Sequence, residues 1–296
     1  MAVPLVFNPT AGRGRAGRHI AAICATFRES GVEVSPTPSR QPGEVELLVK
    51  EAIAEGHKRI VVAGGDGSIG EAANGIFATD PQTELGVVPV GTGDDFAKAS
   101  SIAPHWEHAT ALLADRLSSD APGRPIDVGR CNERYFVNVA GVGFDAEVST
   151  IAKRIRLPIG DAVYFLALLR ALMHGIATPR LKISFRQTIL HDTFTLVSFC
   201  NGAWVGGMFQ LAPDAVNDDG RLDAVCVDAV KRRRIVQLLP RLARGRHLNF
   251  SEVNIHSLRK CTIEAEAPLV WHADGEIQAP ASKFEIELLP GALLLL

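Results

Sequence analysis

The feature that most constrains the fold is a repeated pairing of a short β-branched run with a helix-length segment, over residues 3 to about 120. Such segments follow the runs VPLVFNP, VEVSPTP, RIVVAGG and LGVVPVG. Strand–helix units in series predict a parallel sheet with helices on both faces. Ligands of such sheets bind in loops at the carboxyl ends of the strands. We therefore expect a doubly wound α/β domain over residues 1–122.

The pattern changes in the rest of the chain, where alternating runs follow one another with few helices between them. These runs cover residues 134–143, 180–190, 193–204, 221–230, 261–266 and 283–289. Alternation with turn residues predicts an antiparallel, β-sandwich domain over 123–296, with a helical insertion at 145–175. The Ser, Asp, Gly and Pro cluster at 118–125 marks the boundary. We expect the final GALLLL to be a buried strand that returns to the N-terminal domain.

Composition excludes several classes of protein. With 47% hydrophobic and 22% charged residues and a net charge of −2, the chain is globular and has no general affinity for nucleic acid. The five cysteines are scattered and odd in number, so they indicate buried thiols in a reducing compartment. The N-terminus lacks a signal-peptide pattern, and no apolar run is long enough to span a bilayer. These features predict a cytoplasmic protein.

Three glycine-rich turns follow predicted strands of the first domain: NPTAGRGRAGR at 8–18, GGDGSIG at 64–70 and GTGDDFA at 91–97. Glycines there let successive backbone N–H groups close on an anion, and a helix N-terminus adds partial positive charge. Any one of them could simply be a tight turn. Three at corresponding strand ends favour a polyphosphate site.

The second turn raises the question of Asp66. Gly65, Gly67 and Gly70 satisfy GxGxxG, with Glu84 further on, but a dinucleotide fingerprint belongs on the first strand–helix turn. An acid inside the turn would repel a pyrophosphate. A divalent cation between Asp66 and the phosphates resolves this, because Mg²⁺ prefers one or two carboxylates plus phosphate oxygens. No GxxxxGK[ST] sequence occurs, so a P-loop is excluded.

The motifs NPTAGRG, GGDGSIGEAANG and VPVGTGDDFAKA resemble the signature blocks of the diacylglycerol kinase catalytic domain family, which includes bacterial soluble lipid kinases and sphingosine and ceramide kinases. Four further blocks agree in order: PIDVG, NVAGVGFDAEV, APDAVNDDGRLD and HADGE. The resemblance implies a nucleotide-binding domain like that of phosphofructokinases and NAD kinases, joined to a β-sandwich. It also implies that ATP binds in the cleft between these domains.

By motif position, the resemblance assigns nucleotide contacts to all three turns and to the end of the second strand. The residues are Asn8, Gly12, Arg13, Ser39, Arg40, Gly64, Gly65, Asp66, Gly67, Ser68, Ile69, Gly70 and Thr92. The chain departs from the family pattern at Ser68, where Thr is usual, and at Asp94, where Asn is usual. The extra carboxylate of Asp94 either weakens phosphate binding or adds a metal ligand.

The catalytic residues are predicted to be acids. Phosphoryl transfer to an alcohol needs a base within reach of the hydroxyl. The resemblance gives this role to Asp274 of HADGE, and we expect Glu276 to orient it, Asp66 to hold Mg²⁺ and Asp127 to join the network through water. On sequence alone, a β-turn at Asp274–Gly275 is the commoner explanation, and the place of the block in the family pattern reverses that preference. Replacing Asp274 by Asn is expected to abolish turnover while leaving folding and ATP binding intact.

The block PDAVNDDGRLD does not match an EF-hand, because no Glu stands at the last position. In related bacterial lipid kinases it holds a structural Mg²⁺ with one Asp and two backbone carbonyls. By position these ligands are Asp219 and the carbonyls of Val216 and Arg221. The alternative is an acidic turn without metal.

The segment KRRRIVQLLPRLARGR is basic and amphipathic. Two interpretations stay open: a docking surface for anionic lipid headgroups, or a surface helix whose apolar side packs on the sandwich. With 6% aromatic residues, the chain lacks the stacking platforms of nucleic-acid binders. The expected partner is a lipid at the membrane surface, contacted peripherally and transiently. The oligomeric state is left open, with a homodimer among the alternatives.

The sequence thus predicts an ATP- and Mg²⁺-dependent lipid kinase acting on a hydroxyl of diacylglycerol or a related lipid. Two alternatives are a soluble kinase like NAD kinase, which shares the GGDG turn, and a catalytically inactive nucleotide-binding sensor. A dinucleotide-dependent oxidoreductase ranks last.

Overall fold

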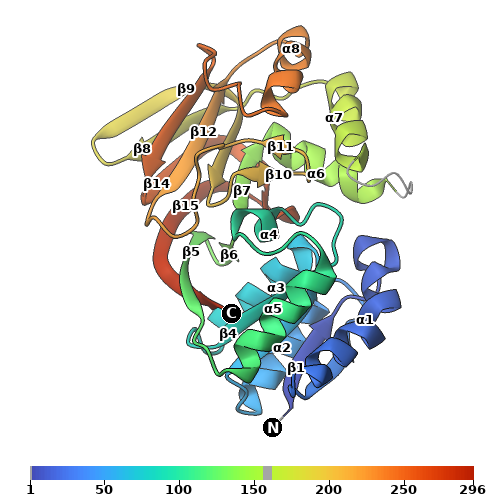
Figure 1. Ribbon diagram of the computed structural model, residues 1–296. Helices are drawn as coiled ribbons and strands as arrows, with labels where there is room; N and C mark the ends of the chain where they lie inside the picture. The colour runs from blue at the N-terminus through green and yellow to red at the C-terminus, as the bar shows by residue number, and fades with distance from the viewer. Residues whose placement is uncertain (1, 156–161) are drawn as a thin grey trace. The chain divides into compact units, whose positions relative to one another are not determined.

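The protein is described by a computed structural model that covers residues 2–155 and 162–296. The chain divides into two compact units. The first contains the residues up to Asp127 together with Gly291–Leu296, and the second contains Val128–Pro290. Figure 1 shows the residues up to Asp127 in blue to green, the second unit in green to red, and the C-terminal residues that belong to the first unit in red.

The first unit is a mixed α/β domain. Its elements are β1 Val3–Phe7, α1 Ala11–Glu29, β2 Val34–Pro38, α2 Glu44–Ala54, β3 Arg59–Gly64, α3 Asp66–Phe77, β4 Glu84–Pro89, α4 Asp95–Ala99 and α5 Trp106–Ser118. The strands are parallel in the order β4–β3–β1–β2. The end of the last strand lies parallel to β4, pairing Leu294 with Glu84.

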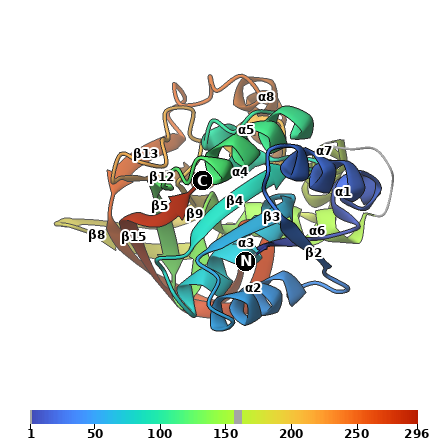
Figure 2. The same ribbon diagram turned by 60° about the horizontal axis from the view of Figure 1, so that its bottom comes forward.

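Alternation along the strands decides which helices cover each face. Leu5 and Phe7 of β1 point into one apolar cluster, together with Ile23 of α1 and Leu113 of α5. On the other face α2 and α3 pack against each other. Figure 2 shows β3 and β4 side by side, with α5 and α1 on one side of them and α2 on the other. Each fully buried Leu, Ile or Phe contributes about 1.5–3 kcal/mol to this packing.

The second unit is an antiparallel β-sandwich-like domain, and its described residues include three helices. Its elements are β6 Arg134–Phe136, β7 Val139–Gly143, α6 Phe144–Arg154, α7 Ala162–His174, β8 Arg180–Phe185, β9 Thr188–Cys200, β10 Trp204–Val205, β11 Phe209–Gln210, β12 Leu222–Asp228, α8 Arg232–Leu242, β13 Val253–Leu258, β14 Lys260–Ala273 and β15 Glu276–Leu295. Strand β5 Arg124–Cys131 crosses from the first unit and pairs with β6.

Two long strands organise the second sheet. Each of β9 and β14 pairs with β8 over one half and with β7 over the other. The predicted break between runs at 190–193 is therefore wrong, because the hairpin turns at Arg186, whose φ of 50° is left-handed. Figure 1 shows β8 and β9 extending together as this hairpin.

The predicted strand over 134–143 is interrupted between β6 and β7. Its ladder breaks at Val137 and Asn138 because their backbone N–H groups donate to the Asp274 carboxylate instead. A side chain from a distant turn thus replaces two sheet hydrogen bonds. This exchange sets the geometry described below.

The basic segment forms α8, and its apolar side is buried through Ile235, Leu238 and Leu239. Ile235 and Leu239 pack with residues of α6 and α7 in an apolar cluster that includes Phe144. On the other side, Arg234 pairs with Glu252 at 2.7 Å. The apolar face therefore packs within the protein. Within the described ranges, no helix combines the length and hydrophobicity that a bilayer crossing requires.

All five cysteines are free thiols. Four of them are buried, as expected, whereas Cys24 is half-buried on α1. Burial raises the pKa of Cys131, Cys226 and Cys261 to about 12, so these thiols stay protonated and inert at neutral pH.

Candidate active site

Three glycine turns gather at one edge of the first unit. They follow β1, β3 and β4, which are neighbours in a parallel sheet, so their carboxyl ends meet. A Cβ on Gly12 of the first turn would lie 2.0 Å from the Val90 carbonyl oxygen, just before the third turn. A Cβ on Gly65 of the second would lie 2.9 Å from the Gly91 Cα of the third. The structure therefore brings all three turns into backbone contact.

The first turn owes its shape to consecutive left-handed residues. Gly12, Arg13 and Gly14 have φ values of 55°, 62° and 80°, so the regular part of α1 begins only after them. Asn8 fixes the entry to this turn, since its Oδ1 accepts hydrogen bonds from the Thr10 N–H at 3.0 Å and the Thr10 hydroxyl at 2.8 Å. Only glycine adopts such angles without strain, which explains its use at Gly12 and Gly14.

Asp66 is the first residue of α3. Its Oδ1 accepts a hydrogen bond from the Phe96 N–H of α4 at 2.8 Å, which ties the second turn to the third. Burial raises the pKa of the Asp66 carboxyl, while the N–H groups of Phe96 and Asp95 and the charge of Lys98 lower it. The free N–H groups of the first turn of α3 and the helix dipole make the same place suitable for an anion.

Asp94 lies beside this carboxylate. It is left-handed, with φ of 49°, and its Oδ1 accepts the Gly91 N–H at 2.9 Å. Asn and Asp are the side chains that best tolerate this conformation, so Asp preserves the turn. Burial first, and the negative charge of Asp66 second, raise the pKa of Asp94 from 3.8 to about 7. Asp94, in place of the Asn of the family pattern, therefore changes the charge of the turn and leaves its backbone conformation unchanged.

The other predicted nucleotide contacts lie around the same edge. These residues are Ser39, Arg40, Gly64, Gly67, Ser68, Ile69, Gly70 and Thr92. Thr92 and Arg40 are exposed, whereas Ser39, Ser68 and Ile69 are buried. Ile69 is fully buried, so its side chain belongs to the core and only its backbone can face a ligand. The Ser68 side chain is packed against Gly64, whose Cβ would lie 2.5 Å from that of Ser68.

Asp127, the predicted network acid, is buried at the end of the first unit. Its Oδ1 accepts the Gly291 N–H at 2.7 Å, where the last segment of the chain re-enters this unit. The side chain thus fastens β5 to the returning strand. This contact gives Asp127 a structural role in addition to any role in a water network.

In the second unit, the Asp274 carboxylate is held by three backbone N–H groups. Its Oδ1 accepts from Asn138 and Val139 at 2.9 Å each, and its Oδ2 accepts from Val137 at 2.8 Å. The Asp274 N–H donates in turn to the Val139 carbonyl at 2.8 Å. Asp274 has a left-handed φ of 49° in the turn between β14 and β15. Its carboxylate is therefore fixed in orientation, with much of its acceptor capacity in use.

Glu276, two residues on, is less constrained. Its Oε2 pairs with Lys153 Nζ of α6 at 2.5 Å, and the two side chains are 37% and 43% exposed. An exposed pair of this kind contributes at most about 1 kcal/mol to stability. The Glu276 carboxylate is therefore free to exchange Lys153 for another partner.

A buried side-chain network supports this turn. Asp145 Oδ2 accepts hydrogen bonds from the Ser198 hydroxyl and from His272 Nε2, the latter at 3.3 Å. His272 Nδ1 accepts the Gly275 N–H at 3.2 Å, so Nε2 carries the proton of the neutral ring. Gly141 leaves room for the pair, since a Cβ there would lie 1.8 Å from Asp145 Oδ2.

Sequence reasoning missed this network, although both ends stand in recognised blocks. Asp145 belongs to NVAGVGFDAEV and His272 to HADGE. A buried His two residues from a candidate base was the available signal. Nothing in the sequence indicated Ser198, which comes from β9.

The predicted metal loop lies before β12. Asp219 Oδ1 accepts the Arg221 N–H at 2.8 Å, which closes the loop on itself, and Val216 is exposed. Within the residues the structure describes, no group of three or more His, Cys, Asp or Glu side chains is arranged to hold a metal ion. The proposed set of one carboxylate and two carbonyls uses fewer side chains than that.

Comparison with known proteins gives the family. The model described as "Diacylglycerol kinase catalytic domain" matches residues 2–131. The model described as "YegS C-terminal NAD kinase beta sandwich-like domain" matches residues 138–296.

Full-length relatives carry the same name. A diacylglycerol kinase of Mycobacterium tuberculosis is 31% identical, covering 99% of this chain and 94% of its own length. One of Bacillus subtilis is 28% identical, covering 92% and 88%. A crystal structure of a putative diacylglycerol kinase from Bacillus anthracis superposes with a TM-score of 0.79 at 24% identity, covering 99% of this chain and 96% of its own, which shows the shared fold.

These matches confirm the resemblance drawn from the glycine turns and the HADGE block. The chain belongs to the diacylglycerol kinase family of phosphotransferases.

Proposed function

We propose that the protein transfers the γ-phosphate of ATP, with Mg²⁺, to a hydroxyl of diacylglycerol or a related lipid. The observation that carries this proposal is the backbone contact of the Gly65 and Gly91 turns beside the Asp66 carboxylate. Relatives named diacylglycerol kinase support the choice of acceptor. We place the reaction in the cytoplasm, at a transiently contacted membrane surface, and the first unit in the doubly wound class of nucleotide-binding folds.

The residues of the first unit fit a bound polyphosphate. Side chains at Gly12, Gly65 or Gly91 would collide with neighbouring backbone, so the turns can approach one another and a ligand only as glycines. Arg15 and Lys98 supply positive charge, and both lower the pKa of Asp94. Asp66 would hold Mg²⁺, with phosphate oxygens completing its coordination. When bound, the ion neutralises charge that develops on the phosphates.

The proton of the lipid hydroxyl is taken by a carboxylate of the turn between β14 and β15. Asp274 is the base expected from the sequence, but its oxygens already accept three N–H hydrogen bonds. Such donors stabilise the charged form and reduce its basicity. Glu276 is not held by backbone N–H groups in this way, since its carboxylate pairs with the exposed Lys153. We therefore propose that the two carboxylates divide the work, with Asp274 fixing the turn and either one accepting the proton.

A radiolabelled ATP assay tests the proposal. Purified protein is incubated with Mg²⁺ and labelled ATP, in parallel with diacylglycerol in mixed micelles and with NAD. We expect labelled lipid and unlabelled NAD. Label on NAD alone would identify a soluble kinase like NAD kinase and contradict the lipid assignment.

Two variants assign the base. Glu276→Gln and Asp274→Asn are compared at equal folded fraction, measured by circular dichroism. If Glu276 is the base, its variant loses at least 100-fold in kcat at an unchanged KM for ATP, in line with the usual contribution of general bases. Full turnover in both variants would exclude this turn from the chemistry.

One observation favours the sensor alternative. Asp94, whose pKa burial first and the charge of Asp66 second raise to about 7, is ionised above that pH, so ATP phosphates would then bind next to two charged acids, where the family pattern has one. Calorimetry showing ATP binding, together with no labelled product from a mixed lipid extract, would establish a sensor.

A further inference from the structure

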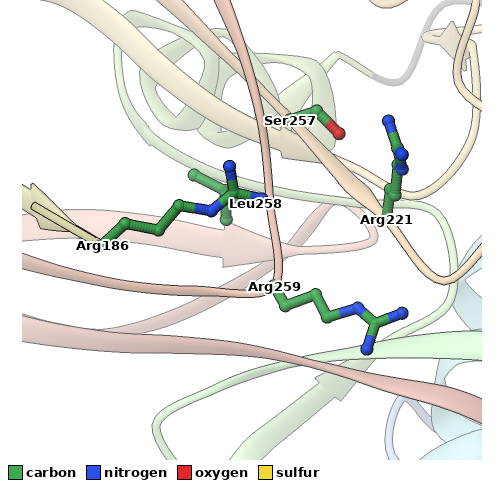
Figure 3. Close-up of a pocket in the computed structure, with 5 residues that line it drawn as sticks. All are labelled: Arg186, Arg221, Ser257, Leu258 and Arg259. Carbon is green, nitrogen blue, oxygen red and sulfur yellow. The ribbon is translucent and has the colours of Figure 1, made fainter. Parts of the chain in front are cut away.

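Three arginines line one hollow in the second unit, and none of the lining residues is among those assigned above to ATP or to the base, although the Arg221 carbonyl belongs to the predicted metal loop. The hollow has a volume of about 480 Å³ and is bordered by Arg186, Arg221, Ser257, Leu258 and Arg259. Arg186 is in the turn between β8 and β9, Arg221 stands directly before β12, and Arg259 lies between β13 and β14. Figure 3 shows Arg186 extending toward Leu258, with the Arg221 and Arg259 side chains extending from neighbouring segments.

The fold brings these segments to the same place. Leu222, at the start of β12, pairs with Leu258 at the end of β13. Thr262 of β14 pairs with Ser184, two residues before Arg186. The hollow therefore lies where the β8–β9 hairpin turn, the connection between β13 and β14 and the loop before β12 meet, and its position does not depend on a single segment.

The hollow contains no carboxylate to balance its three guanidinium charges. In the described part of the chain, none of the three guanidinium groups forms an ion pair. Two acids stand close to Arg221 in sequence, and neither lines the hollow: Asp219 accepts the backbone N–H of Arg221, and burial raises the pKa of Asp223 while the charge of Arg221 opposes that rise. Three like charges around one hollow repel one another unless an anion lies between them.

Arg259 is fixed in place for such a ligand. Its Nε donates to the Gly220 carbonyl at 2.7 Å, which leaves the two terminal nitrogens of the fork unused. Gly220 has φ of 70°, and a Cβ there would lie 2.9 Å from a terminal nitrogen of Arg259. Glycine at this position thus provides room for the guanidinium.

We propose that this hollow binds a phosphate group. Guanidinium forks match phosphate oxygens bidentately, and a phosphate has enough oxygens to engage more than one arginine, whereas a carboxylate fills one fork. The Ser257 hydroxyl supplies a further donor. The volume lies within the usual range of small-ligand sites. The group can come from a soluble phosphate compound or from the headgroup of an acidic phospholipid.

The test uses backbone amide NMR of the full chain, because the amides of Gly220 and Ser257 report on this hollow and not on the glycine turns. Sodium phosphate is titrated at constant ionic strength, with sodium chloride as the balancing salt. The second arm uses vesicles of phosphatidylcholine with and without phosphatidic acid, measured by co-sedimentation.

The test variant is Arg186→Gln, Arg221→Gln, Arg259→Gln. Its matched control, Arg28→Gln, Arg233→Gln, Arg244→Gln, removes the same charge from exposed arginines elsewhere. We expect phosphate to shift both reporter amides saturably, with affinity at least tenfold weaker in the test variant and unchanged in the control. If the triple variant does not fold, Arg259→Lys replaces it, since this change keeps the charge and removes the fork.

The two arms identify the source of the phosphate. Shifts with free phosphate alone indicate a soluble ligand. Vesicle binding that needs phosphatidic acid and is lost in the test variant indicates a headgroup. Reporter amides that stay unmoved by phosphate, together with equal vesicle binding in both variants, would overturn the proposal. Vesicle binding lost only in the control would assign lipid contact to the arginines of the control, on α1 and in and after α8, and would also reject the headgroup source.

Discussion

The glycine turns of the first unit and the Asp274 turn of the second are held in their conformations by different kinds of contact. The glycine turns are built from backbone: Gly12, Gly65 and Gly91 touch other main-chain atoms, and one side chain, Asp66, links them. The Asp274 turn depends on side chains, with a carboxylate in an amide cradle and a buried histidine bonded to the turn itself. A Cβ added to one of these glycines would disrupt the glycine turns. The Asp274 turn would be disrupted by a hydrogen-bond donor placed where an acceptor is needed.

The largest effect on stability is expected from adding a Cβ to a glycine turn, because these turns are held by contacts between backbone atoms. Gly12→Ala places this atom 2.0 Å from the Val90 carbonyl oxygen and keeps a left-handed φ. Overpacking and strain together should lower the free energy of unfolding by about 3 kcal/mol, measured by urea denaturation. ATP binding, followed by calorimetry at a temperature where the variant is folded, should be lost.

Gly31→Ala is the matched control for this change. Gly31 is also left-handed, with φ of 77°, but nothing lies within 4 Å of its Cβ position. Only the conformational strain remains, so the loss should be about 1 kcal/mol. Equal losses at the two positions would show that contact between the turns is not what requires glycine.

The corresponding change in the Asp274 turn, which is held by side chains, is Asp274→Asn. The amide group can replace only one carboxylate oxygen, so an NH₂ must face at least one of the N–H groups of Val137, Asn138 and Val139. A buried N–H left without an acceptor costs about 1–3 kcal/mol. Contrary to the expectation from sequence, we therefore predict a loss of about 2 kcal/mol in unfolding free energy as well as reduced turnover. Thermal unfolding at neutral pH measures the first, and wild-type stability would mean that the cradle is not formed in solution.

Asp145→Asn tests the support behind the turn. If the NH₂ of Asn takes the Oδ2 position, it faces the N–H of His272, which then shifts its proton to Nδ1 and releases the Gly275 N–H; if it takes the Oδ1 position, it faces the Ala146 N–H and the tautomer is kept. As a positioning residue, Asp145 should affect kcat, by about tenfold, at an unchanged KM for ATP. Nitrogen NMR of the His272 ring reports the tautomer directly. Ser198→Ala removes one hydrogen bond to the same oxygen without reversing a donor, and it should leave the tautomer and kcat close to wild type.

The same contrast explains how much the sequence revealed. Glycines directly after predicted strands indicate tight turns, so the three turns and their order along the chain could be predicted. The sequence did not predict that the Asp66 carboxylate links the second turn to the third through the Phe96 N–H. The network of Asp145, Ser198 and His272 depends on a register that places three strands or their ends together, which no local pattern encodes.

The amide cradle of Asp274 was hidden for a related reason. The alternation over 134–143 indicated one continuous strand, and only tertiary structure shows that Val137 and Asn138 donate to a carboxylate instead of a neighbouring strand. The alternating pattern correctly predicted strand on either side of the break, in β6 and β7. The competing acceptor came from residues more than a hundred positions away.

The smallest effect is expected from Asp94→Asn, which changes the charge of the third glycine turn and keeps its conformation. Asp94→Asn keeps the left-handed conformation and the acceptor for the Gly91 N–H, and it removes a carboxyl whose pKa rises from 3.8 to about 7 on folding. A raised pKa means that the folded protein binds the proton more tightly, so wild-type stability is lost as the pH rises from about 4 through 7. The variant should therefore equal the wild type below pH 4 and exceed it above pH 7. Because the carboxyl keeps part of its surface in water, the gain should be about 1 kcal/mol.

Denaturation curves at pH 4 and pH 8 measure the difference in stability between the variant and the wild type. ATP affinity at pH 8 should rise by up to about tenfold, because repulsion of the phosphates is removed. A stability gap that is the same at both pH values would show that the side chain acts through packing, and would assign this position to shape, like the glycines around it.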